Sequence, residues 1–292
     1  MTSDNNKLPD FETIHVMPGL YCNFYCTHCV NDSGPKQSLK VSSDELLKIK
    51  ESVSSHAPPN LQFTGGEPTF YSVEINSIIE AHPNIEKCQV QLTTNGWYAS
   101  SKKGIEEKLG EFIKVDILLL SYDKFHSSKV TGIQIENLIQ YCKENGIKFG
   151  ISMCISDPKE MLEARAILSK YDADLIFQKV DSTGRAKKNK CAYKYPSFEP
   201  EVLEKKCPNL NTISYIAGKG FTNCCGNLIF NASNTKSYAN DDIDEYTASD
   251  FKSKLAKKTF GELMDERGID VNVLEPKHSS PCSLCEFIWE GQ

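Results

Sequence analysis

Three cysteines near the N-terminus carry the clearest chemical signal in this sequence. Cys22, Cys26 and Cys29 are separated by three and then by two residues. Three thiolates on one short loop can hold three irons of a cubic 4Fe–4S cluster, which normally takes four thiolates. The fourth iron would be open to another ligand, so the cluster would be a reagent as well as an electron store. A zinc site is the alternative, although zinc usually takes a C-x2-C pair with a second, distant pair.

The composition of the chain makes metal binding the best explanation for its 12 cysteines. The first ten residues are polar and lack the hydrophobic segment of a secretory signal, so we expect a cytoplasmic protein, whose thiols stay reduced. No apolar run approaches the ~20 residues that span a bilayer, so we expect no membrane attachment. The net charge of −6 and the dispersed Lys and Arg residues predict no nucleic-acid partner.

The elements that must position these cysteines alternate between strands and helices. Apolar, β-branched segments predict strands at residues 12–17, 61–64, 88–94, 115–121, 148–155 and 174–180. Segments with helical periodicity predict helices at residues 43–55, 72–81, 102–109, 133–145 and 159–170. This alternation predicts an α/β fold, a partial (β/α)6 barrel of the TIM type over residues 10–185. The site of such a barrel lies at the C-terminal ends of its strands, where the cysteine loop begins.

The alternation stops near Gly184, and residues 186–292 have weak periodicity. This C-terminal segment contains a second set of cysteines: Cys207, Cys224, Cys225, Cys282 and Cys285. A segment with so little apolar core needs a metal, so we predict a small metal-stapled module. Its C-x2-C pair suits zinc and an iron–sulfur cluster equally. Cys88, Cys142 and Cys154 lie in strand or helix patterns and are expected in the core.

Two cysteines of the second set, Cys224 and Cys225, are adjacent in the sequence. Successive side chains of an extended chain point to opposite faces, so both thiols do not easily bind one cluster. If Cys224 is the ligand, Cys225 faces the other way and stays a free thiol. A thiol within reach of a carbon radical can donate a hydrogen atom, and return of hydrogen to the opposite face inverts the carbon. The alternative is that Cys225 is a spare buried cysteine or the true ligand.

The first cysteine motif, together with Gly65-Gly66-Glu67-Pro68 after the second predicted strand, resembles the radical S-adenosylmethionine (SAM) superfamily. The resemblance implies that SAM binds the open iron and is cleaved by one electron to a 5′-deoxyadenosyl radical, which abstracts hydrogen. It implies that the two glycines let the backbone approach the SAM methionine, with Glu67 near its amino group. An electron donor such as a flavodoxin or a ferredoxin is implied as a partner.

Polar residues follow two further predicted strands. Asn95 follows the third strand, and Ser121 and Asp123 follow the fourth. The resemblance favours a role for them in binding SAM or the substrate, over the strand-to-helix turns in which such residues are common. Lys179 and Arg185, near the end of the last predicted strand, are weaker candidates for anchoring a carboxylate.

The C-terminal segment resembles the auxiliary-cluster extension of the twitch or SPASM-like type. This resemblance implies a second 4Fe–4S cluster with every iron occupied, held by Cys207, Cys224, Cys282 and Cys285. The segments FTGGEPTFY, LTTNGWYASSKKG, LSYDKFH, CPNLNTISY, NCCGNLIF and PCSLC resemble radical SAM peptide epimerases of the epipeptide type, which convert L- to D-residues in a ribosomally made peptide. That resemblance implies Cys225 as the hydrogen donor, although the spacing from Gly220 leaves open an exchange of roles with Cys224.

Three other functions fit the same residues. The first is a radical SAM epimerase of a small molecule such as an aminoglycoside sugar. The second is oxidation or crosslinking of a peptide, with the auxiliary cluster as electron acceptor. The third is a zinc-stabilised binding module without catalysis.

Overall fold

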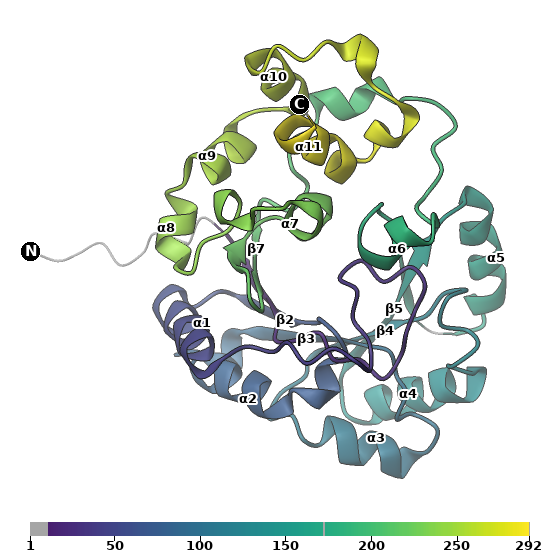
Figure 1. Ribbon diagram of the computed structural model, residues 1–292. Helices are drawn as coiled ribbons and strands as arrows, with labels where there is room; N and C mark the ends of the chain where they lie inside the picture. The colour runs from purple at the N-terminus through teal and green to yellow at the C-terminus, as the bar shows by residue number, and fades with distance from the viewer. Residues whose placement is uncertain (1–10, 172, 292) are drawn as a thin grey trace, which may run out of the picture.

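The computed structural model describes residues 11–171 and 173–291 of the chain, which Figure 1 shows as a ribbon. The polar N-terminal segment, and with it the predicted start of the barrel at residue 10, lies outside the described residues. The described elements confirm an α/β fold in which parallel strands alternate with helices along the first two thirds of the chain.

The centre of the molecule is one sheet of eight strands in the order β6-β5-β4-β3-β2-β1-β7-β8. Six parallel strands confirm the predicted partial barrel: β1 Thr13–Met17, β2 Asn60–Phe63, β3 Gln89–Thr94, β4 Ile117–Ser121, β5 Lys148–Ile155 and β6 Asp174–Lys179. The C-terminal part of the chain adds β7 (Thr212–Ile216), parallel to β1, and β8 (Gly220–Thr222), antiparallel to β7. The sheet is therefore completed by residues about two hundred positions beyond its first strand.

Alternation along the strands gives the sheet two different faces. In β4, Leu118 and Leu120 are fully buried, whereas Leu119 and Ser121 on the other face are only half-buried. The buried face packs against helices, and each fully buried leucine contributes roughly 1.5–3 kcal/mol. The other face lines a cavity, which separates it from the C-terminal part of the chain.

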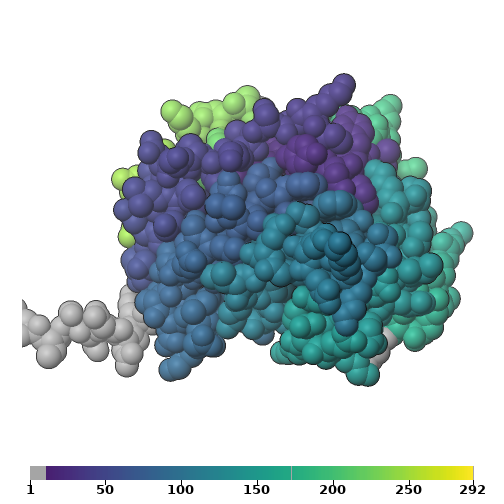
Figure 2. Space-filling model, turned by 90° about the horizontal axis from the view of Figure 1, so that it is seen from below, coloured from purple at the N-terminus to yellow at the C-terminus, as the bar shows by residue number. Residues whose placement is uncertain are grey.

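Five helices cover the buried face of the sheet (Figure 1): α1 Ser43–His56, α2 Ser72–Glu80, α3 Lys102–Leu109, α4 Gly132–Glu144 and α5 Pro158–Leu168. They form the surface seen from below in Figure 2, on which the yellow C-terminal segment is not visible. The start of α1 is fixed by a capping box, in which Ser42 Oγ accepts from the Glu45 N–H at 3.2 Å and Glu45 Oε2 accepts from the Ser42 N–H at 2.8 Å.

The C-terminal helices lie on the other side of the sheet (Figure 1): α6 Gly184–Lys188, α7 Asn227–Asn231, α8 Ile243–Thr247, α9 Asp250–Lys257, α10 Phe260–Glu266 and α11 Pro281–Glu290. Short 3-10 helices join these elements: η1 Pro68–Phe70, η2 Ile85–Lys87, η3 Pro200–Glu204, η4 Thr235–Ser237, η5 Val271–Val273 and η6 Pro276–Ser279. The β7–β8 hairpin is held on α1 by Glu45, whose Oε1 accepts from Tyr215 Oη at 3.0 Å and from the Gly218 N–H at 2.9 Å. Among the described residues, every helix is too short or too polar to cross a membrane.

Candidate active site

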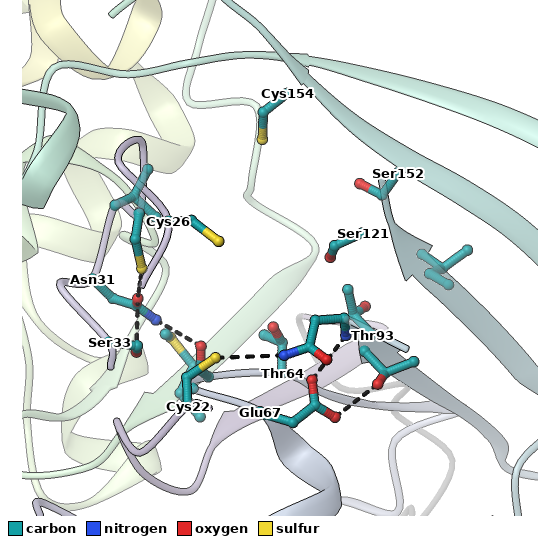
Figure 3. Close-up of a pocket in the computed structure, with 18 of the residues that line it drawn as sticks. Cys22, Cys26, Asn31, Ser33, Thr64, Glu67, Thr93, Ser121, Ser152 and Cys154 are labelled. Carbon is teal, nitrogen blue, oxygen red and sulfur yellow. Dashed lines mark hydrogen bonds between the residues drawn. The ribbon is translucent and has the colours of Figure 1, made fainter. Parts of the chain in front are cut away.

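A cavity of about 420 Å³ lies at the C-terminal ends of the barrel strands (Figure 3). Its lining brings together ten of the residues predicted from the sequence: Cys22, Cys26, Cys29, Gly65, Gly66, Glu67, Asn95, Ser121, Asp123 and Cys225. Pro68 instead begins η1 and is buried beside the cavity. Residues that are far apart in the sequence therefore share one site, as expected for the strand ends of a barrel.

The cysteine loop that follows β1 is ordered by hydrogen bonds to its own thiols. Cys22 Sγ accepts from the Phe24 N–H at 3.4 Å and from Asn95 Nδ2 at 3.6 Å. Cys29 Sγ donates to Asn31 Oδ1 at 2.9 Å, and Asn31 Nδ2 donates to the carbonyl oxygen of Gly65 at 2.9 Å. All three cysteines are free thiols that line the same cavity. This donor set fits an iron–sulfur cluster with three protein ligands.

The Gly65-Gly66 turn packs directly against the backbone that precedes Cys22. The Gly66 N–H donates to the Gly19 carbonyl at 2.8 Å, and the Glu67 N–H donates to the Tyr21 carbonyl at 2.8 Å. A Cβ on Gly66 would lie 1.8 Å from the Tyr21 carbonyl oxygen. Gly65 has φ +124°, a conformation that favours glycine. The glycines are thus required by a close approach within the chain, a reason that the sequence did not reveal.

Glu67 is 1 % exposed and joins the ends of β2 and β3. Its Oε1 accepts from Thr94 Oγ1 at 2.7 Å and from Thr69 Oγ1 at 2.8 Å, and its Oε2 accepts from the Asn95 N–H at 2.8 Å. Burial raises the pKa of Glu67 although these hydrogen bonds oppose the shift. The network fixes Asn95, whose amide nitrogen then reaches Cys22. Figure 3 shows this chain of contacts from Glu67 to the cysteine loop.

Asp123 is the second buried carboxylate of the cavity. Its Oδ1 accepts from His126 Nδ1 at 2.8 Å, its Oδ2 accepts from the Cys154 N–H at 3.1 Å, and His28 Nε2 lies 3.8 Å from Oδ2. Burial alone would raise the pKa of Asp123, but the hydrogen bond and charge of His126 hold it below its usual value. The carboxylate of Asp123 is therefore bound by protein groups. The Ser121 hydroxyl has no hydrogen-bond partner among the described residues.

The structure adds residues that sequence reasoning missed or misassigned. Cys154 was expected in the core, but it is half-buried and its thiol points into the cavity (Figure 3). Cys88 and Cys142 are buried as expected. His28 also lines the cavity, and its position inside the cysteine motif was the only sequence signal for it.

The two cations proposed to anchor a carboxylate both contact other groups of the protein. Lys179 Nζ lies 4.6 Å and 4.3 Å from the ring centroids of Tyr193 and Tyr195. The Arg185 guanidinium is buried and bonded to the cysteine loop. Arg185 borders the large cavity with its guanidinium bonded to the loop, whereas Lys179 is not among the residues that line it.

The second set of cysteines meets around a smaller, apolar cavity of about 50 Å³. Its lining includes all five: Cys207, Cys224, Cys225, Cys282 and Cys285. Cys282 and Cys285 lie one helical turn apart on α11, so they share a face of that helix. A Cβ on Gly226 would lie 2.8 Å from Cys282 Sγ, so the backbone after the adjacent pair passes close to α11. Four of these thiols, from three segments of the chain, are enough for a fully ligated cluster: Cys207, Cys224, Cys282 and Cys285.

The adjacent cysteines, Cys224 and Cys225, line different cavities. Cys225 lines both the large cavity and the small one, whereas Cys224 lines only the small one. Cys225 is accessible because it borders these cavities, while Cys224 is half-buried. The two side chains therefore have different surroundings, as alternation along the backbone predicts.

Comparison with known proteins gives one family match and several relatives. The profile of the radical SAM superfamily matches residues 16–166. YydG of Bacillus subtilis (strain 168), a protein named for peptide biosynthesis, is 23% identical over 301 residues, which cover 96% of this chain and 92% of YydG. GTP 3′,8-cyclase of Clostridium perfringens (strain SM101 / Type A) is 28% identical over 197 residues, which cover 63% of this chain and 60% of that enzyme.

Two solved structures have the same fold. The structure described as native anSMEcpe with bound AdoMet has a TM-score of 0.56 and 14% sequence identity, and the match covers 95% of this chain and 96% of that one. The structure of native anSMEcpe with bound AdoMet and Cp18Cys peptide has a TM-score of 0.54 and 13% identity, with 83% and 81% covered. At these identities the likeness concerns the fold alone.

Proposed function

Since this chain belongs to the radical SAM superfamily, we propose that it is an epimerase that inverts α-carbons of a ribosomally made peptide from L to D. Cys22, Cys26 and Cys29 would hold the first 4Fe–4S cluster. Gly65, Gly66, Glu67, Pro68, Asn95, Ser121 and Asp123 are the residues proposed to form the SAM site around it. When bound, the cluster and SAM supply a carbon-centred radical that removes a hydrogen atom from the substrate.

The second cysteine set is proposed to form an auxiliary site in a module of residues 186–292, after a barrel of residues 10–185. Cys207, Cys224, Cys282 and Cys285 would hold a second 4Fe–4S cluster. The apolar lining of their cavity supports this role, because it limits the access of water to the ligands.

The position of Cys225 between the two cavities is the observation that carries the proposal. Its S–H bond breaks to give a hydrogen atom to the substrate carbon, where a new C–H bond forms, and a sulfur radical remains on Cys225. One electron and one proton restore the thiol, and a flavodoxin or a ferredoxin is the proposed electron source. Delivery to the face opposite the abstraction inverts the carbon without a net change in the redox state of the substrate.

The lining of the large cavity supports an uncharged peptide as substrate. Among the described residues, eight polar but uncharged side chains border it without a hydrogen bond to the protein: Gln62, Thr64, Gln91, Thr93, Ser121, Ser152, Gln178 and Thr212. Amides and hydroxyls of this kind suit the N–H and C=O groups of a peptide.

Charged substrates find fewer partners in the same cavity. The carboxylates of the described lining, Glu67 and Asp123, are already assigned to the proposed SAM site, which leaves none for the ammonium groups of an aminoglycoside. The guanidinium of Arg185, which a substrate phosphate would need, is engaged by the cysteine loop. These contacts favour a peptide over an aminoglycoside sugar.

The test is a reaction in D2O with a candidate peptide substrate, and a small open reading frame beside the gene, if one is found, would encode the first candidate. An epimerase that uses an exchangeable thiol should add one deuterium for each inverted residue, whereas an oxidase or a crosslinking enzyme should remove two hydrogens. We expect Cys225→Ala to cleave SAM but not to invert the peptide. Cys154→Ser, which removes a second cavity thiol that is not proposed to bind a cluster, should still invert it. Inversion by the Cys225→Ala protein would show that another group donates the hydrogen.

A further inference from the structure

Arg185 of α6 contacts the cysteine loop with its whole side chain. It is 3 % exposed, and its Nε donates to the Cys26 carbonyl at 2.8 Å. One terminal nitrogen donates to Asp32 Oδ1 at 2.8 Å, and the other donates to the carbonyl of Ser33. The guanidinium carbon lies 3.9 Å from the ring centroid of Tyr25. Three acceptors and a ring thus surround a planar group whose five N–H donors have a fixed geometry.

The backbone beside Arg185 binds the same loop. The Arg185 N–H donates to the Cys29 carbonyl at 2.9 Å, and Asn189 Nδ2 donates to the Thr27 carbonyl at 2.8 Å. A Cβ on Gly184 would lie 2.6 Å from the Cys29 oxygen, so the two segments are in close contact. The loop has little regular secondary structure, and its carbonyl groups need such partners.

The segment that carries Arg185 is itself anchored on the C-terminal part of the chain. Thr183 Oγ1 donates to Asn231 Oδ1 at 3.2 Å, and Asn231 Nδ2 donates to the Ser182 carbonyl at 3.2 Å. Asp181 Oδ1 accepts from Ser280 Oγ at 2.8 Å. A side chain on an anchored segment holds its acceptors more precisely than one on a free loop.

We propose that Arg185 is a positioning residue for the first cluster. The hydrogen bonds of its guanidinium fix the conformation of residues 22–33, so that the three thiols are in place to bind the metal. Arg185 and Lys188 share the single carboxylate of Asp32, so a net positive charge remains beside the loop and favours the reduced and more negative state of the cluster. Arg185 borders the cavity, and the role proposed for it is to act through the loop and not on the substrate. The proposal requires only the family's cluster on Cys22, Cys26 and Cys29, and stands whether or not the reaction is an epimerisation.

Two substitutions separate the geometry of Arg185 from its charge. Arg185→Lys keeps the charge but cannot bond three acceptors at once, whereas Arg185→Met loses both. Arg165→Met is the matched control, because Arg165 lies on α5 over the ring of Phe177, away from the cysteine loop.

The measurements use the holoenzyme under anaerobic conditions. The electron paramagnetic resonance signal that changes when SAM is added identifies the first cluster. For this signal we would measure the midpoint potential and the rate of loss to an iron chelator. Hydrogen exchange of residues 22–33 in the metal-free protein reports the loop without the cluster.

We expect Arg185→Met to shift the potential to a more negative value and to speed the loss of the first cluster about tenfold. Arg185→Lys should speed the loss but keep a potential near that of the wild type, and both variants should exchange faster in residues 22–33. The proposal is overturned if Arg185→Met matches Arg165→Met in potential and rate. It is also overturned if, in both Arg185 variants, the second cluster is lost as much faster as the first. Arg185 would then stabilise the whole protein and not the first site in particular.

Discussion

Substitution of Gly66 by alanine should displace the cysteine loop through a single clash. The added Cβ would lie 1.8 Å from the Tyr21 carbonyl oxygen, and 2.8 Å from the Leu20 carbonyl carbon. Ordinary contact begins near 3.4 Å, so the two backbones must separate by about 1.6 Å (3.4 − 1.8). Both groups are backbone and cannot rotate away, and Cys22 is the next residue along the chain.

The same movement breaks the hydrogen bonds that join the turn to the loop. The Gly66 N–H bond to Gly19 and the Glu67 N–H bond to Tyr21 are both 2.8 Å long. Two such bonds contribute together about 1–3 kcal/mol, so we expect that loss in the free energy of unfolding. A displacement of more than 1 Å at the cysteine loop should lower the rate of reductive SAM cleavage about 100-fold.

The assay compares Gly66→Ala with Gly132→Ala. Gly132 begins α4, has an ordinary φ, and its added Cβ would meet only the movable hydroxyl of Tyr171 at 3.0 Å. Alanine there should change stability by less than about 1 kcal/mol and leave SAM cleavage unchanged. Unfolding in urea gives the free energy, and formation of 5′-deoxyadenosine under dithionite gives the rate. Wild-type SAM cleavage by Gly66→Ala would refute the argument that this close approach positions Cys22.

Two further predictions concern the stability of the frame around the site. Glu45→Ala removes both the α1 capping box and the acceptor of Tyr215 and Gly218, so the free energy of unfolding in urea should fall by about 2 kcal/mol. Glu51 is exposed on the same helix, so Glu51→Ala should change this free energy by less than about 0.5 kcal/mol. An equal loss in the two variants would contradict the role of Glu45 in joining α1 to the hairpin. Burial lowers the pKa of His15 from 6.5 to about 4, so below pH 6.5 the unfolded chain binds a proton that the folded chain does not, and stability should fall by up to about 3 kcal/mol towards pH 4. The thermal midpoint should therefore drop less between pH 7 and pH 5 in His15→Gln than in the wild type, and an identical drop would show that His15 is not kept neutral by the fold.

The sequence predicted most of the fold because the strands and helices have distinct local patterns. The pairing of β7 with β1 was not predictable, since no local signal joins Thr13–Met17 to Thr212–Ile216 across the length of the barrel. Cys154 was misassigned because β5 is almost entirely apolar, and such a strand does not reveal which face meets a cavity. Arg185 was recognised as a cation near a strand end, but its acceptors are carbonyl groups of the chain, whose positions depend on the folded loop.

The pairing of β1 with β7 also sets an order for biosynthesis. Strands β1 to β6 and Arg185 leave the ribosome before any residue of the second cysteine set, and β7 follows later. At roughly 5–20 residues per second, the 107 residues from 186 to 292 (292 − 185) take about 5–20 s to synthesise. During that interval Asn231 and Ser280, which anchor the Arg185 segment, are not yet made, and the side of the sheet that the C-terminal helices will cover is still open. A maturation partner that delivers iron and sulfide would then have a limited time to reach the first site before the rest of the chain folds over it.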